Sequence, residues 1–319
     1  MANTIRASVI QSCTARFNLS ETLDKFESLT RLAKERDGTQ LVVFPEGFIG
    51  GYPKWSTFSC FVGERISEGR DEFVKYYNAA IEIPSPAIDR IAEVSKATGV
   101  FVVMGVIERD VGTLYCTAIF VDPVEGLVAK HRKLLPTACE RFIWGQGDGS
   151  TLPVVAKKFQ SSVEPTHTVH TKISATICWE NFMPLLRTYY YSLGTQIYCV
   201  PTVDSRETWE SSMRHIAFEG RCFVLSACQF ATEKDYPPDH AVADANNRNP
   251  DNIMINGGSL IVSPLGKVLA GPTRQPEDIL TADLDLDDVV RGKFDLDTVG
   301  HYSRPDVFQL KANIDPTLI

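Results

Sequence analysis

Short runs of β-branched and apolar residues alternate with longer amphipathic segments along most of this chain. The short runs predict strands, and segments with apolar residues three and four positions apart predict helices between them. Because no Gly/Ser-rich or Pro-rich linker interrupts the 319 residues, we expect a single domain over 1–319, with a core at about 5–285. Strands that alternate with helices in this way favour a layered α/β fold with mixed sheets.

The pattern assigns most elements. Helices are expected at 19–36, about 68–80, 87–98, 183–193 and 209–220, and Ser20 is the expected N-cap of the first. Strands are expected at 5–10, 41–44, 100–106, 115–121, 127–132, 172–178, 197–201, 223–229, 259–263 and 268–271. The polar segment from Lys157 to His170 is expected to form an exposed loop.

The composition argues against several classes of function. The net charge is −8 and no run of lysine or arginine indicates a nucleic-acid groove. No apolar stretch is long enough for a membrane span and the N-terminus lacks a signal peptide, so we expect a cytoplasmic protein with no membrane partner. The eight cysteines lack paired spacing, which favours reduced thiols. His167 and His170 have no cysteine partners, so we expect neither zinc nor another metal or cofactor.

Three predicted strands carry a chemically competent side chain at or near their carboxyl end. Glu46 and Lys133 closely follow the predicted strands 41–44 and 127–132, and Cys178 ends the predicted strand 172–178. A thiol, a carboxylate and an amine at three strand ends can converge as nucleophile, base and cation. Taken singly, each has a simpler interpretation: a core cysteine, a loop glutamate and a solvated lysine.

The residues around these three positions resemble the catalytic motifs of the nitrilase superfamily of carbon–nitrogen hydrolases. The matching motifs are Phe44-Pro45-Glu46, His131-Arg132-Lys133-Leu134 and Cys178-Trp179-Glu180. Three further segments, 50–53, 140–150 and 300–305, are similar to nitrilases of the plant and fungal type. The resemblance as a whole covers about residues 5–310. The resemblance implies a four-layer α-β-β-α sandwich. It also implies a homodimer that can extend into helical oligomers, with 286–319 as an extension at an oligomer interface.

The resemblance assigns roles to four residues. Cys178 would be the nucleophile, Glu46 the general base, and Lys133 the proton donor and charge stabiliser. Glu140, seven residues after the lysine, would be a second glutamate that orients Lys133 or positions substrate; an ion pair of purely structural value is the alternative. The expected substrate-binding residues are Trp179, Tyr52 and Thr202, and packing explains Tyr52 and Thr202 equally well. His215 and Glu219 lie one helical turn apart and are interpreted as structural.

The implied reaction is hydrolysis of a nitrile to a carboxylic acid and ammonia, with the small-molecule nitrile as the only partner besides other copies of the chain. Aliphatic, arylaliphatic and cyano-amino-acid nitriles all stay open. The alternatives are a nitrile or cyanide hydratase that releases an amide, and an aliphatic amidase. A non-enzymatic assembly subunit is disfavoured, because competent residues occupy all four catalytic positions. The segments 58–77 and 235–252 are expected to be interface inserts, and a mobile surface loop explains the second equally well.

Overall fold

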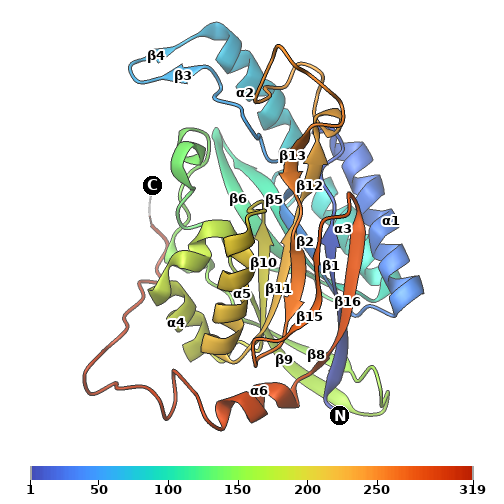
Figure 1. The fold of residues 1–319 in the computed structure, drawn as a ribbon, viewed down its shortest axis with the longest axis vertical. Coiled ribbons are helices and arrows are strands. Elements are labelled where there is room, and N and C mark those ends of the chain that lie inside the picture. The colour runs from blue at the N-terminus through green and yellow to red at the C-terminus, as the bar shows by residue number, and fades with distance from the viewer. Residues whose placement is uncertain (1, 318–319) are drawn as a thin grey trace.

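Two six-stranded sheets lie face to face at the centre of the molecule (Figure 1). The computed structural model describes residues 2–317. The first sheet has the order β16 (Asp278–Asp285), β1 (Thr4–Gln11), β2 (Leu41–Ile49), β5 (Phe101–Asp110), β6 (Thr113–Asp122) and β7 (Gly126–Arg132). The second has the order β15 (Val268–Thr273), β14 (Ser259–Val262), β11 (Phe223–Cys228), β10 (Ile197–Thr202), β9 (Thr168–Ala175) and β8 (Val155–Gln160).

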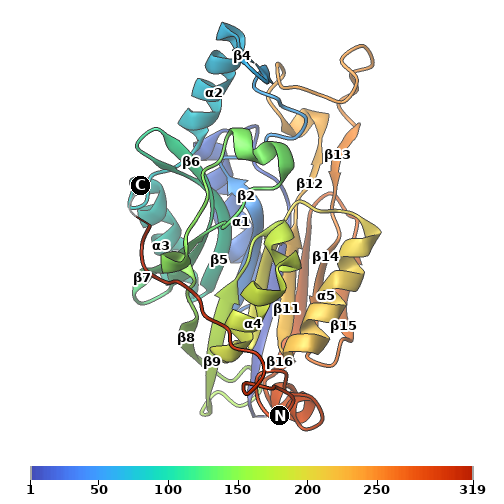
Figure 2. The same cartoon turned by 90° about the vertical axis from the view of Figure 1, so that its left-hand side faces the viewer.

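A pair of helices covers the outer face of each sheet (Figures 1 and 2). Helices α1 (Leu19–Asp37) and α3 (Pro86–Thr98) pack on the first sheet, and α4 (Pro184–Ser192) and α5 (Glu207–Gly220) lie over the second. Three apolar clusters fill the spaces between layers, and the largest joins the inner faces of the two sheets. The predicted four-layer α-β-β-α sandwich with mixed sheets is therefore confirmed.

Strand direction brings several carboxyl ends to one edge. In the first sheet β2 and β5 are parallel, and β7 runs in the same direction because two antiparallel pairings separate it from β5. In the second sheet β9, β10 and β11 are parallel. The carboxyl ends of parallel strands meet at one edge of a sheet, so side chains near the end of β2 and just after β7 become neighbours although they are far apart in sequence.

Two local predictions were wrong. The segment from Lys157 to His170 is not a loop throughout, since β8 and the start of β9 form an antiparallel hairpin across it. Its inward residue Phe159 is buried between exposed polar neighbours, and this period-two pattern is typical of a strand with one solvent-exposed face. The N-cap of α1 is Asn18 rather than Ser20, because the Asn18 side chain accepts a hydrogen bond from the backbone N–H of Glu21.

Two segments project together from one end of the sandwich (Figures 1 and 2). One contains β3 (Cys60–Phe61), β4 (Glu64–Arg65) and α2 (Ser67–Ala79), and the other is the loop between β12 (Phe230–Thr232) and β13 (Ile253–Asn256). An ion pair between Lys75 and Asp239 joins the two segments. At the opposite end, α6 (Asp287–Lys293) leads into an extended and largely exposed tail. Within residues 2–317, no helix is long and apolar enough to cross a membrane.

Candidate active site

Glu46 lies near the end of β2, where the strand is irregular. Its pairing with β5 shifts register between Phe44 and Ile49, and the Glu46 side chain points into the space between the sheets, fully buried. The backbone of Glu46 comes so close to β5 that a Cβ on Gly105 would lie 2.5 Å from the Glu46 Cα. Only glycine leaves room for this approach. The Glu46 carbonyl accepts a hydrogen bond from Gln229 Nε2 at 2.7 Å, which ties it to the second sheet.

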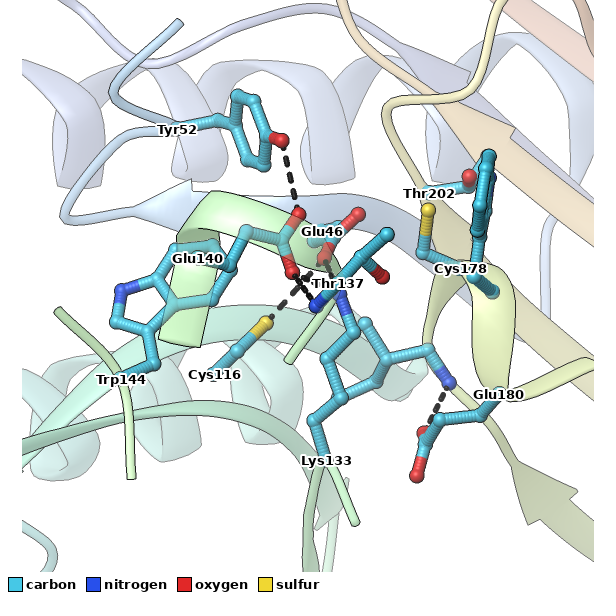
Figure 3. Close-up of polar contacts among 12 residues, drawn as sticks. Glu46, Tyr52, Cys116, Lys133, Thr137, Glu140, Trp144, Cys178, Glu180 and Thr202 are labelled. Atoms are coloured by element: carbon cyan, nitrogen blue, oxygen red, sulfur yellow. Dashed lines mark hydrogen bonds and ion pairs between the residues drawn. The ribbon is translucent and has the colours of Figure 1, made fainter. Parts of the chain in front are cut away.

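Lys133 is the first residue after β7, and its side chain is buried. Its backbone N–H donates to the Cys116 carbonyl and its own carbonyl accepts from Gly147, both at 2.8 Å. The ammonium Nζ donates to Glu46 Oε1 and to Glu140 Oε2, each at 2.8 Å (Figure 3). A buried ammonium between two carboxylates is paired and hydrogen-bonded, as a charge in the interior must be.

Glu140 sits in a short 3-10 helix, Ala138–Phe142, that follows the lysine. Its Oε2 accepts from Lys133 Nζ and from the Thr137 backbone N–H at 2.6 Å, and its Oε1 accepts from the Tyr52 hydroxyl at 2.8 Å. Both carboxylate oxygens are therefore occupied. The indole of Trp144 closes this side, with its ring centroid 5.5 Å from the lysine Nζ and 5.8 Å from the Tyr52 ring.

Cys178 opens a second 3-10 helix, Cys178–Phe182, just beyond the end of β9. Its φ is +51°, in the left-handed region that non-glycine residues rarely adopt. Backbone strain of this kind is found at functional sites, where the surrounding structure holds the residue in place. The sulfur is buried near the Thr202 hydroxyl, whose hydrogen bond acts to lower the pKa of the thiol (Figure 3). The sharp turn presents the thiol to the gap between the strand ends.

Burial controls the protonation of the three central groups. It raises the pKa of Cys178 well above the ordinary thiol value, with a further contribution from the Glu46 charge and an opposing one from Lys133. It also raises the pKa of Glu46, against the lowering effects of Lys133 and Cys178. Burial alone would lower the pKa of Lys133, but the negative charges around it, with Glu46 the largest contributor and Cys178 and Glu140 among the others, together outweigh burial and the net shift is upward. The lysine is thus charged, and the resting thiol is neutral and needs a base.

The two oxygens of Glu46 differ in their surroundings. Oε1 accepts from Lys133 Nζ and from the Cys116 thiol, whose sulfur is 3.5 Å away. Oε2 is buried and has no hydrogen-bond partner among residues 2–317. The Cys178 thiol approaches the same carboxyl from the opposite side to Cys116 (Figure 3). An unpartnered buried oxygen beside a neutral thiol is suited to accept the thiol proton.

Trp179 forms an accessible wall next to Cys178. Its side chain is 42% exposed, and its indole N–H donates to Asp204 Oδ2 at 2.9 Å. The guanidinium of Arg206 lies 4.9 Å from the indole centroid and also pairs with Asp204. These contacts hold the ring beside Cys178, where it can contact a bound molecule.

The structure brings Glu46, Lys133, Glu140, Tyr52, Cys178 and Thr202 into one site. His215 lies elsewhere, with Nε2 3.6 Å from Glu219 Oε1 on the outside of α5. Within the described part of the chain, no group of three or more His, Cys, Asp or Glu side chains could hold a metal ion. None of the eight cysteines forms a disulfide. Sequence reasoning missed Cys116 and Gln229, because nothing in their own segments marks them as neighbours of Glu46.

Comparisons with known proteins agree with this arrangement. The sequence matches the carbon–nitrogen hydrolase family over residues 6–294. It is 70% identical to an arylacetonitrilase of Trametes versicolor, with 99% of both chains covered, and 52% identical to a bifunctional nitrilase/nitrile hydratase of Nicotiana tabacum, with 96% of this chain and 85% of that protein covered. The crystal structure of the C. elegans NitFhit protein shares the fold, with a TM-score of 0.72 and 19% identity over 98% of this chain and 68% of that one. The chain therefore belongs to the carbon–nitrogen hydrolase family, within its nitrilase branch.

Proposed function

We propose that this protein is a nitrilase that converts arylacetonitriles to carboxylic acids and ammonia, with Cys178 as nucleophile. The observation that carries the proposal is the neutral buried thiol beside the unpartnered Oε2 of Glu46, next to the Lys133 ammonium. The substrate class rests on the 70% identity to a protein named arylacetonitrilase. The charges of Glu46, Lys133 and Glu140 already pair with one another in the buried site. An uncharged nitrile suits such a site because it brings no further charge that would have to be desolvated.

The first half of the reaction builds a covalent intermediate. Glu46 Oε2 takes the proton from Cys178 Sγ, and the thiolate attacks the nitrile carbon as one C–N π bond breaks. The nitrogen takes up a proton, supplied through Glu46 or Lys133, and a thioimidate results. The Lys133 ammonium and the backbone N–H of Trp179 stabilise the charge that develops, since the first amides of a helix have no acceptor inside it. One such donor contributes about 2.7–4 kcal/mol to catalysis.

The second half releases the products. Glu46 removes a proton from water, which adds to the thioimidate and gives a tetrahedral intermediate. Loss of ammonia leaves a thioester on Cys178, and a second water molecule then releases the carboxylic acid and restores the thiol. Each nitrile thus consumes two water molecules and yields one acid and one ammonia.

A hydratase outcome is the second candidate. If the tetrahedral intermediate expels the Cys178 sulfur instead of ammonia, the product is an amide. The partition depends on which leaving group is protonated, and therefore on the balance between Glu46, Lys133 and Glu140. Relatives that carry the name bifunctional nitrilase/nitrile hydratase support this second outcome as a side reaction.

The assembly prediction enters the proposal as well. We infer a homodimer, extendable to a helical oligomer, in which residues 286–319 contact a second copy. The support is the number of large side chains that this extension leaves in solvent: Phe294 is 89% exposed and Phe308 is 78% exposed. Exposed aromatic side chains on an extended tail indicate an interaction surface.

Product analysis tests the proposed function. Phenylacetonitrile, an aliphatic dinitrile and a cyano-amino acid are each incubated with the enzyme, and ammonia, acid and amide are quantified, with Cys178→Ala as control. Equal amounts of acid and ammonia from phenylacetonitrile, lost in the variant, would support the proposal. Mostly amide would favour the hydratase outcome. Turnover of amides but of no nitrile would refute it.

A further inference from the structure

The carboxylate of Glu180 is buried behind the site and is fully hydrogen-bonded. Its Oε1 accepts from the backbone N–H of Leu134 at 2.6 Å, and its Oε2 accepts from the backbone N–H of Ile177 at 2.8 Å. His131 Nε2 lies 3.0 Å from Oε2 and 3.2 Å from Oε1. One side chain thus holds the end of β7 and the turn that follows β9 together (Figure 3).

These contacts bracket the two reacting side chains. His131 and Leu134 lie on either side of Lys133 in sequence, and Ile177 and Glu180 lie on either side of Cys178. The two segments belong to different sheets, so their relative position depends on contacts that cross the sandwich. We propose that Glu180 and His131 are positioning residues, which hold the Lys133 ammonium and the Cys178 sulfur at the separation that the reaction needs.

The hydrogen bonds of His131 determine its protonation. Its Nδ1 is 2.6 Å from the carbonyl oxygen of Thr151, and its Nε2 faces the Glu180 carboxylate. Both oxygens can only accept, so each ring nitrogen must carry a proton and the ring is an imidazolium. Burial acts to lower the pKa of His131, but the charge and hydrogen bond of Glu180 raise it, and the net shift is upward. The pair is therefore a buried ion pair with no water-exposed atoms on either side chain.

The same strand offers a matched control. Glu108 is also buried and accepts hydrogen bonds from Lys130 and Arg132, the neighbours of His131 in β7. Because side chains alternate across a strand, Lys130 and Arg132 point to the other face from His131. Glu108 is bound to the same strand by comparable ion pairs but makes no contact with the Cys178 turn. Its loss should affect stability without moving the nucleophile.

The variants are chosen so that each removes one defined contact. In Glu180→Gln only one oxygen remains, so either Leu134 or Ile177 loses its acceptor. His131→Gln can still donate towards Glu180 from the position of Nε2, whereas His131→Asn can reproduce only the Nδ1 bond to Thr151. All variants are compared with Glu108→Gln in melting temperature, in kcat and KM for phenylacetonitrile, and in the rate at which iodoacetamide alkylates Cys178, followed by peptide mapping.

We expect Glu180→Gln to lower kcat about 100-fold with little change in KM, since a displacement of about 1 Å has that effect and neither residue contacts substrate. His131→Asn should lower kcat about 10-fold or more, and His131→Gln should retain most of the wild-type kcat. Alkylation of Cys178 should slow in Glu180→Gln and His131→Asn, while Glu108→Gln should lose melting temperature and keep wild-type kcat and alkylation.

Several results would overturn the proposal. One is a kcat for Glu180→Gln no lower than that of Glu108→Gln at a similar melting temperature, and another is equal loss in His131→Gln and His131→Asn. If Glu180→Gln does not fold, the two His131 variants decide the question alone. The kinetic readout rests on the proposed nitrilase function. The alkylation readout does not, so a wild-type enzyme that hydrolyses no nitrile would refute that function while alkylation still tests the positioning role.

Discussion

Glu46 and Glu140 both contact Lys133, and replacing each in turn shows which one is the catalytic base and which only supports the lysine. Both Glu46 and Glu140 accept from the lysine Nζ at 2.8 Å, so the ion pairs alone do not distinguish them. Their second oxygens do. Glu46 Oε2 is unpartnered, whereas Glu140 Oε1 accepts from Tyr52. We therefore expect Glu46→Gln to abolish activation of Cys178 and Glu140→Gln to leave it largely intact.

The magnitudes follow from these contacts. In Glu46→Gln the amide oxygen can still accept from Lys133, and the amide nitrogen takes the place of Oε2, which removes the base. A positioned general base contributes roughly 10²–10⁴-fold, so the barrier should rise by about 2.7–5.4 kcal/mol. Glu140→Gln weakens a hydrogen bond to a charged group, which contributes about 1.5–3 kcal/mol, so kcat should fall about 10- to 150-fold.

Two assays on the same preparations separate the effects. Turnover of phenylacetonitrile reports the whole reaction, and alkylation of Cys178 by iodoacetamide reports only the formation of thiolate. Peptide mapping distinguishes Cys178 from the exposed Cys139. Glu46→Gln should lose both activities, and Glu140→Gln should lose turnover but keep an alkylation rate close to that of the wild type. If Glu140→Gln slowed alkylation as much as Glu46→Gln, the assignment of Glu46 as the single base would be wrong.

Three further predictions concern pH and assembly. The pKa of Glu46 is raised, and Glu46 must be ionised to act as a base. The acid limb of the kcat/KM profile should therefore lie above the ordinary glutamate pKa of about 4.3. An acid limb at or below that value would contradict the role of Glu46 as base. The pKa of His131 in the folded protein is raised above its ordinary value of 6.5, so the stability that charged His131 gives the fold is complete below that pH and is lost as pH rises through the folded pKa. The melting temperature of wild type should therefore exceed that of His131→Gln by less as the pH becomes alkaline. A difference that grows with pH would refute the imidazolium. Deletion of residues 239–250 removes the partner segment of α2 and should reduce the particle mass in light scattering to that of a dimer, so an unchanged mass would argue against an interface there.

Most strand ends and the hairpin turns were predicted correctly, because they are marked within a few residues. Glu46, Lys133 and Cys178 each end or follow an apolar run, and the hairpin of β6 and β7 is visible in its turn residues. The strand β16 was missed, since its partly exposed residues give a weak pattern and its only strong signal is the pairing with β1 across the whole chain. Period-two alternation also marks β8, but its outward residues are so polar that the segment resembles a loop.

Contacts that require sheet order could not be predicted. Glu46 and Lys133 are 87 residues apart; their convergence was expected from their motifs, but not the sheet order behind it, in which β7 returns to the direction of β2. The contact between Cys116 and Glu46 and the close approach at Gly105 depend on the same order. Glu180 follows Cys178 in the sequence motif, but its function as a bridge to β7 is visible only once the two sheets are stacked.

Burial is what makes this set of residues work as a unit. A desolvated thiol is a poor acid, and burial raises the pKa of Cys178 accordingly. The same burial raises the pKa of Glu46, and proton transfer depends on the difference between the two values rather than on either alone. When the proton moves from sulfur to Glu46, one negative charge moves from the carboxylate to the sulfur, and the net charge of the site does not change. Lys133 is stabilised by both Glu46 and Cys178, so it faces a negative neighbour before and after the transfer. A site that only relocates its charge needs no solvent to stabilise a new one, and such a site favours an uncharged nitrile over any substrate that carries charge at the reacting end.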